Sequence, residues 1–66
     1  MDRARLIEEK HRVQGEIRAL RPRVERAMGE ASNGRQRRRA QRMQRELERL
    51  MSREGELRMA IDRAPR

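Results

Sequence analysis

Residues 27–43 read AMGEASNGRQRRRAQRM, and this stretch decides the fold because apolar positions on its two sides mirror each other. Seven apolar positions before Asn33-Gly34 and seven after it are spaced by three, four or seven residues, as in a coiled-coil seam. The mirror pairs are Leu6 with Ile61, Ile17 with Leu50, Leu20 with Leu47, Val24 with Met43, and Ala27 with Ala40. The pattern predicts an all-α fold, an antiparallel two-helix coiled-coil hairpin.

The ends of both helices can be predicted from capping and breaking residues. Asp2 suits the start of a first helix over about 2–31, and Pro65 stops a second helix over about 35–63. The turn at 32–34 contains asparagine and glycine, which tolerate left-handed backbone geometry and end helices. The 66 residues then form a single domain, 1–66.

Three helix breakers test the register of the first helix. If Leu6, Val13, Leu20 and Ala27 face the second helix, all three breakers fall on the outermost position. The breakers are Gly15, Pro22 and Gly29. Pro22 should therefore bend the helix without disturbing the seam. A break into three helices at Pro22 is the structural alternative.

The core of such a hairpin is small. Only 33% of the residues are apolar, and the chain has no Phe, Tyr or Trp. Two helices have a single interhelical seam. Short chains also bury a small fraction of their surface, so their folded state is only marginally stable. We therefore expect further burial against a partner, most simply a homodimer that forms a four-helix bundle.

Charges on one flank favour the same antiparallel arrangement. Three pairs of opposite sign are expected across it: Glu16 with Arg53, Arg23 with Glu46, and Glu30 with Arg39. Two polar residues interrupt the seam itself, Lys10 and Glu54, and these could pair diagonally. Such pairs set the register more than they add stability.

The opposite flank has no carboxylate. Its residues include Ile7, Gln14, Met28, Gln44 and Met51, which we call the acid-free flank. The sequence predicts that this flank binds a second copy or another protein. The alternative is ordinary partial burial of its Met and Ile side chains beside the seam.

The net charge of +8 points to a polyanionic partner. The chain has 19 basic residues against 11 acids, and 18 of the basic residues are arginine, whose guanidinium group binds phosphate in a bidentate manner. Two alternatives stay open. A highly charged helical surface has this composition without any ligand, and GC-rich codons also favour arginine.

The basic residues gather at the hairpin tip, where no acid occurs between Ala31 and Arg45. The candidate anion-binding residues are Arg35, Arg37, Arg38, Arg42 and Arg45, with Arg39 partly neutralised by Glu30. Arginines at a helix N-terminus oppose the helix dipole, and a bound phosphate would relieve this. Without aromatic residues for base stacking, we expect phosphate contacts to duplex DNA or structured RNA. The alternative is a solvated basic end.

Signals for other functions are absent from the sequence. The chain has one histidine, His11, no cysteine, and no motif for phosphate loops, zinc or calcium. We expect no enzymatic activity, no cofactor and no metal. No apolar run approaches the length that spans a bilayer. A cytoplasmic protein without a membrane partner is therefore expected.

The stretch EKHRVQGEIRAL at residues 9–20 resembles the YdcH-like family of short bacterial helical hairpins, and Arg49-Leu50 and Ile61 resemble its closing helix. Met51, Ser52 and Glu54 replace lysine-rich positions of that family. The resemblance implies a small cytoplasmic hairpin with no established activity.

Two further likenesses concern architecture. Arg21-Pro22-Arg23-Val24 is similar to the coiled-coil arm of Gre-type transcription factors, but the acidic tip of that arm is replaced here by Ser32-Asn33-Gly34. In size and shape the chain is similar to Rop-type hairpins, which dimerise and bind paired RNA. The rival hypothesis is a protein-interaction or assembly module, or a bare scaffold of engineered origin.

Overall fold

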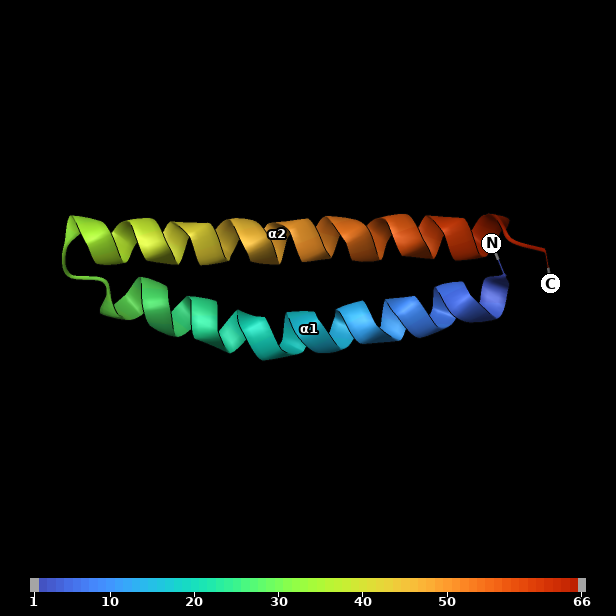
Figure 1. The fold of residues 1–66 in the computed structure, drawn as a ribbon, viewed down its shortest axis with the longest axis horizontal. Coiled ribbons are helices and arrows are strands. Elements are labelled where there is room, and N and C mark those ends of the chain that lie inside the picture. The colour runs from blue at the N-terminus through green and yellow to red at the C-terminus, as the bar shows by residue number, and fades with distance from the viewer. Residues whose placement is uncertain (1, 66) are drawn as a thin grey trace.

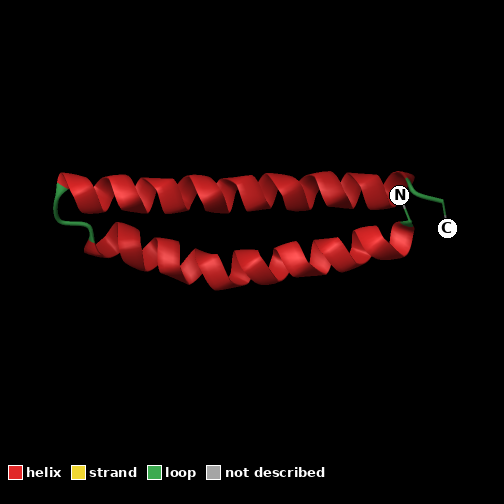
Figure 2. Cartoon of the chain, in the orientation of Figure 1, coloured by secondary structure: helices red, strands yellow, loops and turns green. Residues whose placement is uncertain are grey.

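A computed structural model describes residues 2–65 and contains two long helices, α1 (Arg3–Glu30) and α2 (Gly34–Arg63). The helices run side by side in opposite directions, with the turn at one end and both chain ends at the other (Figure 1). The Cα atoms extend over 51 × 14 × 12 Å. Residues 2–65 contain no strand (Figure 2). The predicted all-α helical hairpin is confirmed, and each helix end lies within one residue of its predicted position.

The N-terminus of α1 is capped as predicted. Asp2 has extended backbone angles, and its side-chain oxygen Oδ1 accepts a hydrogen bond of 3.2 Å from the backbone N–H of Ala4. A capping aspartate satisfies one of the backbone donors that have no partner in the first turn of a helix.

The turn differs from the prediction. No residue in 2–65 has a positive φ, so the expected left-handed geometry at 32–34 is wrong. Asn33 is extended, with φ −143° and ψ 171°, and its Oδ1 accepts a 2.9 Å hydrogen bond from the N–H of Gln36. Asn33 therefore caps the start of α2 instead of ending α1, and Gly34 becomes the first residue of α2.

Gln36 completes this cap from the other side. Its Oε1 accepts hydrogen bonds from the N–H of Ser32 at 2.9 Å and from the hydroxyl of Ser32 at 3.0 Å. The reciprocal arrangement is close to a capping box, in which a residue of the first turn reaches back to the chain before the helix. Three polar residues thus fix the direction in which α2 leaves the turn.

The core is a single apolar layer between the helices. Eight residues are buried, four from each helix: Leu6, Val13, Ile17, Val24, Ala40, Leu47, Leu57 and Ile61. Leu20, Met43, Leu50 and Ala64 pack partly buried against this layer. These twelve belong to the predicted seam, which confirms the mirror about Asn33-Gly34, and two residues beside the seam, Ile7 and Ala60, also pack against the core.

Helix α1 continues through Pro22 and is visibly bowed, whereas α2 is straight (Figure 1). Pro22 is exposed, and a Cβ atom built on Gly15 or Gly29 would meet nothing within 4 Å. The breakers therefore face away from α2, as predicted, and the three-helix alternative is wrong. A proline inside a helix removes one backbone hydrogen bond, which accounts for a bend.

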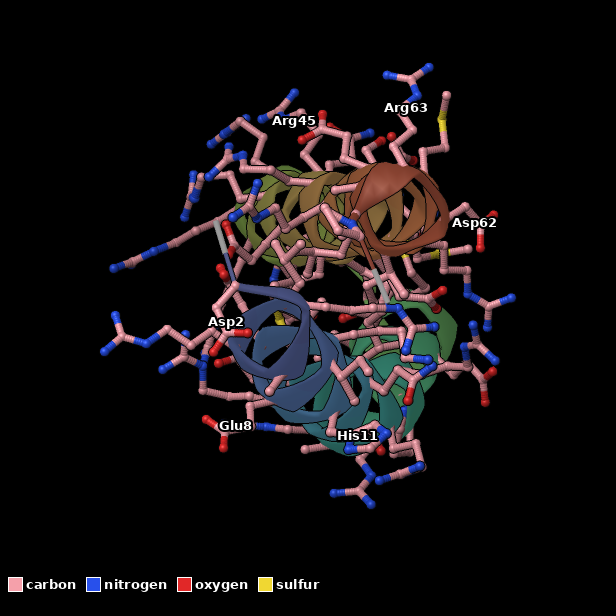
Figure 3. All side chains as sticks on the ribbon, turned by 90° about the vertical axis from the view of Figure 1, so that its right-hand side faces the viewer. Asp2, Glu8, His11, Arg45, Asp62 and Arg63 are labelled. Carbon is pink, nitrogen blue, oxygen red and sulfur yellow. The ribbon has the colours of Figure 1, made fainter. Side chains whose placement is uncertain are left out.

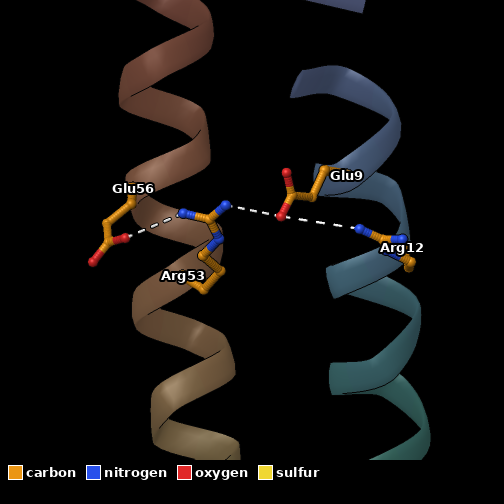
Figure 4. Close-up of polar contacts among 4 residues, drawn as sticks. All are labelled: Glu9, Arg12, Arg53 and Glu56. Carbon is orange, nitrogen blue, oxygen red and sulfur yellow. Dashed lines mark hydrogen bonds and ion pairs between the residues drawn. The ribbon is translucent and has the colours of Figure 1, made fainter. Parts of the chain in front are cut away.

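The predicted charge pairs do not form. Arg53 pairs with Glu9 instead of Glu16, at 2.8 Å, and also lies 3.6 Å from Glu56 of its own helix (Figure 4). Glu46 pairs with Arg49 at 2.9 Å instead of with Arg23. Arg53 therefore still pairs across the seam, with a glutamate seven residues before the predicted one. Residues three or four apart on one helix are already neighbours, so Arg49 competes with Arg23 for Glu46.

Lys10 and Glu54, the two polar residues of the seam, do not form an ion pair with each other. Glu54 pairs with Arg58, four residues further along α2, and not with Lys10. Both Lys10 and Glu54 are half-buried. The expected diagonal pair is therefore wrong for the same reason, since a closer partner lies on the same helix.

Within residues 2–65, neither helix has an apolar stretch of the length that a bilayer crossing needs.

Candidate functional site

Positive charge is concentrated in the half of the hairpin next to the turn. Residues 18–49 contain eleven arginines and four acids, a net charge of +7. The remainder of the chain contains eight basic and seven acidic residues, a net charge of +1. Because the two helices lie side by side, this division along the sequence becomes a division along the molecule, with a basic tip and a nearly neutral open end.

The arginines of the tip have no acidic partner. All six between 35 and 45 are exposed, and none lies within 4.0 Å of a carboxylate of residues 2–65. The expected neutralisation of Arg39 by Glu30 is therefore not found. At the start of α2, the backbone N–H groups of Gly34 and Arg35 have no hydrogen-bond acceptor within residues 2–65. Unpaired cations and free N–H groups at a helix N-terminus both favour a bound anion.

The structure brings two of the predicted site residues together. Arg35 and Arg42 line a hollow of about 510 Å³ beside the start of α2. The rest of its lining consists of Asn33, Gln36 and Arg39. Arg39, which the sequence analysis set aside, thus stands between the two predicted residues.

The other three predicted residues lie outside this hollow. Arg38 folds back along α2, with its Nη1 3.3 Å from the position that a Cβ atom of Gly34 would take. Arg45 projects from the side of α2 that is turned away from α1 (Figure 3). Arg37 is exposed and does not line this hollow. The predicted site is therefore divided between at least two faces of the helix.

A second hollow, of about 380 Å³, lies between the helices on the same flank of the tip. Its lining is formed by Arg23, Arg26, Ala27, Glu30 and Ala31 of α1 and its end, and by Gln36, Arg39 and Met43 of α2. Sequence reasoning missed Arg23 and Arg26. The heptad pattern could have identified them, because it puts Arg23 on the same flank as Arg39, and Arg26 lies about one helical turn after Arg23.

The acid-free flank is only partly open to solvent. Ile7 is half-buried and packs against the core, as the alternative of partial burial expects. Met28 and Met51 are 50% and 47% exposed, so they are available to a partner. Gln14 is half-buried, and the half-buried Gln44 donates a 3.2 Å hydrogen bond to Glu48.

These residues do not form one compact patch. Ile7 and Met28 are 21 residues apart on one helix, which corresponds to about 30 Å at 1.5 Å per residue. A third exposed methionine, Met59, is 55% exposed and was not singled out from the sequence. A partner on this flank would have to lie along much of the hairpin.

The histidine and the acidic side chains are the possible metal ligands of this chain. His11 is exposed and points away from α2 (Figure 3). Within residues 2–65, no three acidic or histidine side chains come together in an arrangement that could hold a metal ion.

Comparisons with family models, with curated proteins and with solved structures find no match to this chain, so the resemblance to YdcH-like hairpins stays a prediction.

Proposed function

We propose that this protein is a non-enzymatic helical hairpin that binds the phosphates of a nucleic acid through its basic tip. One observation supports this most directly: six exposed arginines in the first twelve residues of α2 have no carboxylate within 4.0 Å in residues 2–65. Holding like charges together without a partner is unfavourable, and a polyanion relieves the repulsion.

The mode of binding follows from the residue types. Arginine binds phosphate in a bidentate manner, and no aromatic side chain is present to stack on an unpaired base. Duplex DNA or a structured RNA, recognised by its backbone, is therefore the preferred partner class. We also propose a cytoplasmic location, where such partners occur.

Fluorescence anisotropy with a labelled duplex DNA and a labelled RNA hairpin tests this proposal. Binding should be tight at about 50 mM salt and should weaken steeply as salt rises, because phosphate contacts release counterions. Replacing Arg35 and Arg42 with glutamine should weaken binding and reduce the salt dependence. The same charge change at Arg5 and Arg63, which are exposed near the open end, is the control. Absence of binding to either nucleic acid at low salt would overturn the proposal.

A second candidate function is protein interaction through the acid-free flank, with a second copy as the first choice of partner. The exposed Met28 and Met51 favour it, since large apolar side chains that are half-exposed beside a thin core can be buried further by association. Self-association on this flank and anion binding at the tip use different surfaces, so one protein could do both.

A further inference from the structure

The two hollows at the tip adjoin each other. Both are lined by Gln36 and Arg39, so the hollow beside the start of α2 and the hollow between the helices share these two side chains. We call the two hollows together the tip groove. Its basic lining consists of Arg23 and Arg26 on α1 and Arg35, Arg39 and Arg42 on α2.

We propose that one phosphodiester strand of the nucleic acid lies in the tip groove, held between arginines of both helices. This inference rests on the proposed function and adds two things to it. It assigns binding roles to Arg23, Arg26 and Arg39, and it limits binding to one flank of the hairpin.

The charge of the groove fits such a strand. Its five arginines face a single carboxylate, that of Glu30, and none of the five is in an ion pair within residues 2–65. The guanidinium groups are therefore free to donate to phosphate oxygens from two sides. A ligand held from two helices is fixed in position more firmly than one on a single row of arginines.

The shape of the groove fits a backbone better than a base. Its wall on α2 runs from Arg35 to Arg42, seven residues and about 10 Å. A strand of B-DNA advances about 3.4 Å per phosphate along its axis, so this wall can serve about three successive phosphates. Between the arginines lie Ala27, Ala31 and Met43, which offer apolar contact to sugar carbons and no ring on which a base could stack. Binding should therefore be independent of sequence.

Helix α1 supplies a matched test. Arg23 and Arg26 are three residues apart and line the groove, whereas Arg18 and Arg21 are also three residues apart and lie on the other side of the seam. All four side chains are exposed, and none is in an ion pair within the described chain. The double variants R23Q/R26Q and R18Q/R21Q thus change the net charge equally, in the same half of the same helix.

Anisotropy titrations of a labelled 20-base-pair duplex measure both variants from about 50 to 200 mM salt. We expect R23Q/R26Q to weaken binding on the order of 100-fold at the lowest salt, and to lower the slope of log K against log salt by about 1.8, for two lost phosphate contacts. The affinity of R18Q/R21Q for the duplex should stay within about threefold of that of the unaltered protein, because this variant loses only long-range electrostatic attraction, which salt screens. Circular dichroism should show the same helicity for all three proteins.

The outcomes separate this inference from the proposed function. If the unaltered protein binds and both double variants weaken it equally, the groove assignment is overturned while phosphate binding stands. If the unaltered protein does not bind the duplex or an RNA hairpin at all, the proposed function itself fails. If polyglutamate displaces the duplex as well as an unlabelled duplex does at equal charge, the site is a general polyanion or protein surface, and the phosphodiester assignment is wrong.

Discussion

The guanidinium Nη2 of Arg53 donates a 2.8 Å hydrogen bond to Oε1 of Glu9, and this is the one ion pair that joins the two helices within residues 2–65. The pair lies in the nearly neutral half of the hairpin, away from the tip. The hydrogen bond from Arg53 lowers the pKa of Glu9 below its ordinary value of 4.5, and the same contact raises the pKa of Arg53. The two halves of the molecule therefore differ. An ion pair joins the helices in the half near the chain ends, whereas the arginines between 35 and 45 in the tip half form no ion pair within residues 2–65.

The Glu9–Arg53 pair should make stability depend on acid pH. Because the pKa of Glu9 is lower in the folded chain than in the unfolded chain, the pair stabilises the fold above about pH 4.5 and its contribution is lost as the pH falls through the folded pKa of Glu9. Thermal unfolding followed by circular dichroism between pH 7 and pH 3 measures this. The melting temperature of the unaltered protein should fall more steeply on acidification than that of E9Q.

Glu8 provides the control for this experiment, since it is exposed and has no ion-pair partner within the described chain. E8Q should keep the pH dependence of the unaltered protein. If E9Q and E8Q titrate alike, the Glu9–Arg53 pair contributes nothing to stability in solution.

The turn geometry leads to a second prediction, in which substitution of two neighbouring residues by alanine has a large effect at one and a small effect at the other. Asn33→Ala removes the side-chain acceptor for the N–H of Gln36 and should cost about 1 kcal/mol in the free energy of unfolding. Gly34→Ala should change it by less than about 0.5 kcal/mol, since Gly34 is helical and a Cβ atom would meet only the movable end of Arg38. Urea titrations of both variants measure the difference.

A left-handed turn would give a different result. Forcing an alanine into left-handed geometry costs about 1–2 kcal/mol, so a large loss of stability in Gly34→Ala would show that the glycine adopts a positive φ in solution. Asn33→Asp should retain the cap and serves as the control for Asn33→Ala.

Two glycines inside the helices make a third prediction. A Cβ atom added at Gly15 or at Gly55 would meet nothing within 4 Å, so alanine can be accommodated at either site without a clash. Each substitution should stabilise the protein by about 0.5–1 kcal/mol, because glycine loses more backbone entropy than alanine on entering a helix. The reverse change at the exposed Ala19, A19G, should destabilise it by a similar amount. A loss of stability in G15A would contradict the open packing at that position.

Most of the architecture could be predicted from the sequence, because apolar spacing reports directly on which face of a helix is covered. Buried residues such as Val24 and Leu57 were placed by their seam positions alone. The turn was harder. Asparagine and glycine occur both after the end of a helix and at the start of the next one, and spacing cannot tell which helix Asn33 caps.

The site was predicted only in part, for a different reason. A run of arginines can be counted along α2, but Arg23 and Arg26 join Arg39 only when the two helices are placed side by side. Ion pairs were mispredicted because heptad positions show which side chains could meet across the seam and give no weight to nearer partners. The i,i+3 pair of Glu46 and Arg49 is one such case.

Glu30 carries the one carboxylate of the tip groove, and its removal provides the fourth prediction. E30Q should strengthen duplex binding about threefold at low salt, as expected for removing a like charge roughly 6 Å from a phosphate in water, about 0.7 kcal/mol. Anisotropy measures the change. Glu25 is exposed on the same helix and does not line the groove, so E25Q is the control and should have a smaller effect. Unchanged affinity in E30Q would argue against a ligand in this groove.

The acid-free flank can be tested with two methionines of α2. Met51 lies on this flank and is 47% exposed, whereas Met59 is 55% exposed on the outer face of the same helix. If two copies associate through the flank, Met51→Glu should weaken the dimer by about tenfold or more, because it buries an unpaired carboxylate, and Met59→Glu should not. Light scattering at about 100 μM, where a dimer of moderate affinity is populated, measures the mass of each protein. A monomer mass for the unaltered protein would rule out self-association at this concentration. Equal loss of the dimer in both variants would place the interface elsewhere, since the two substitutions differ only in the face of α2 that they alter.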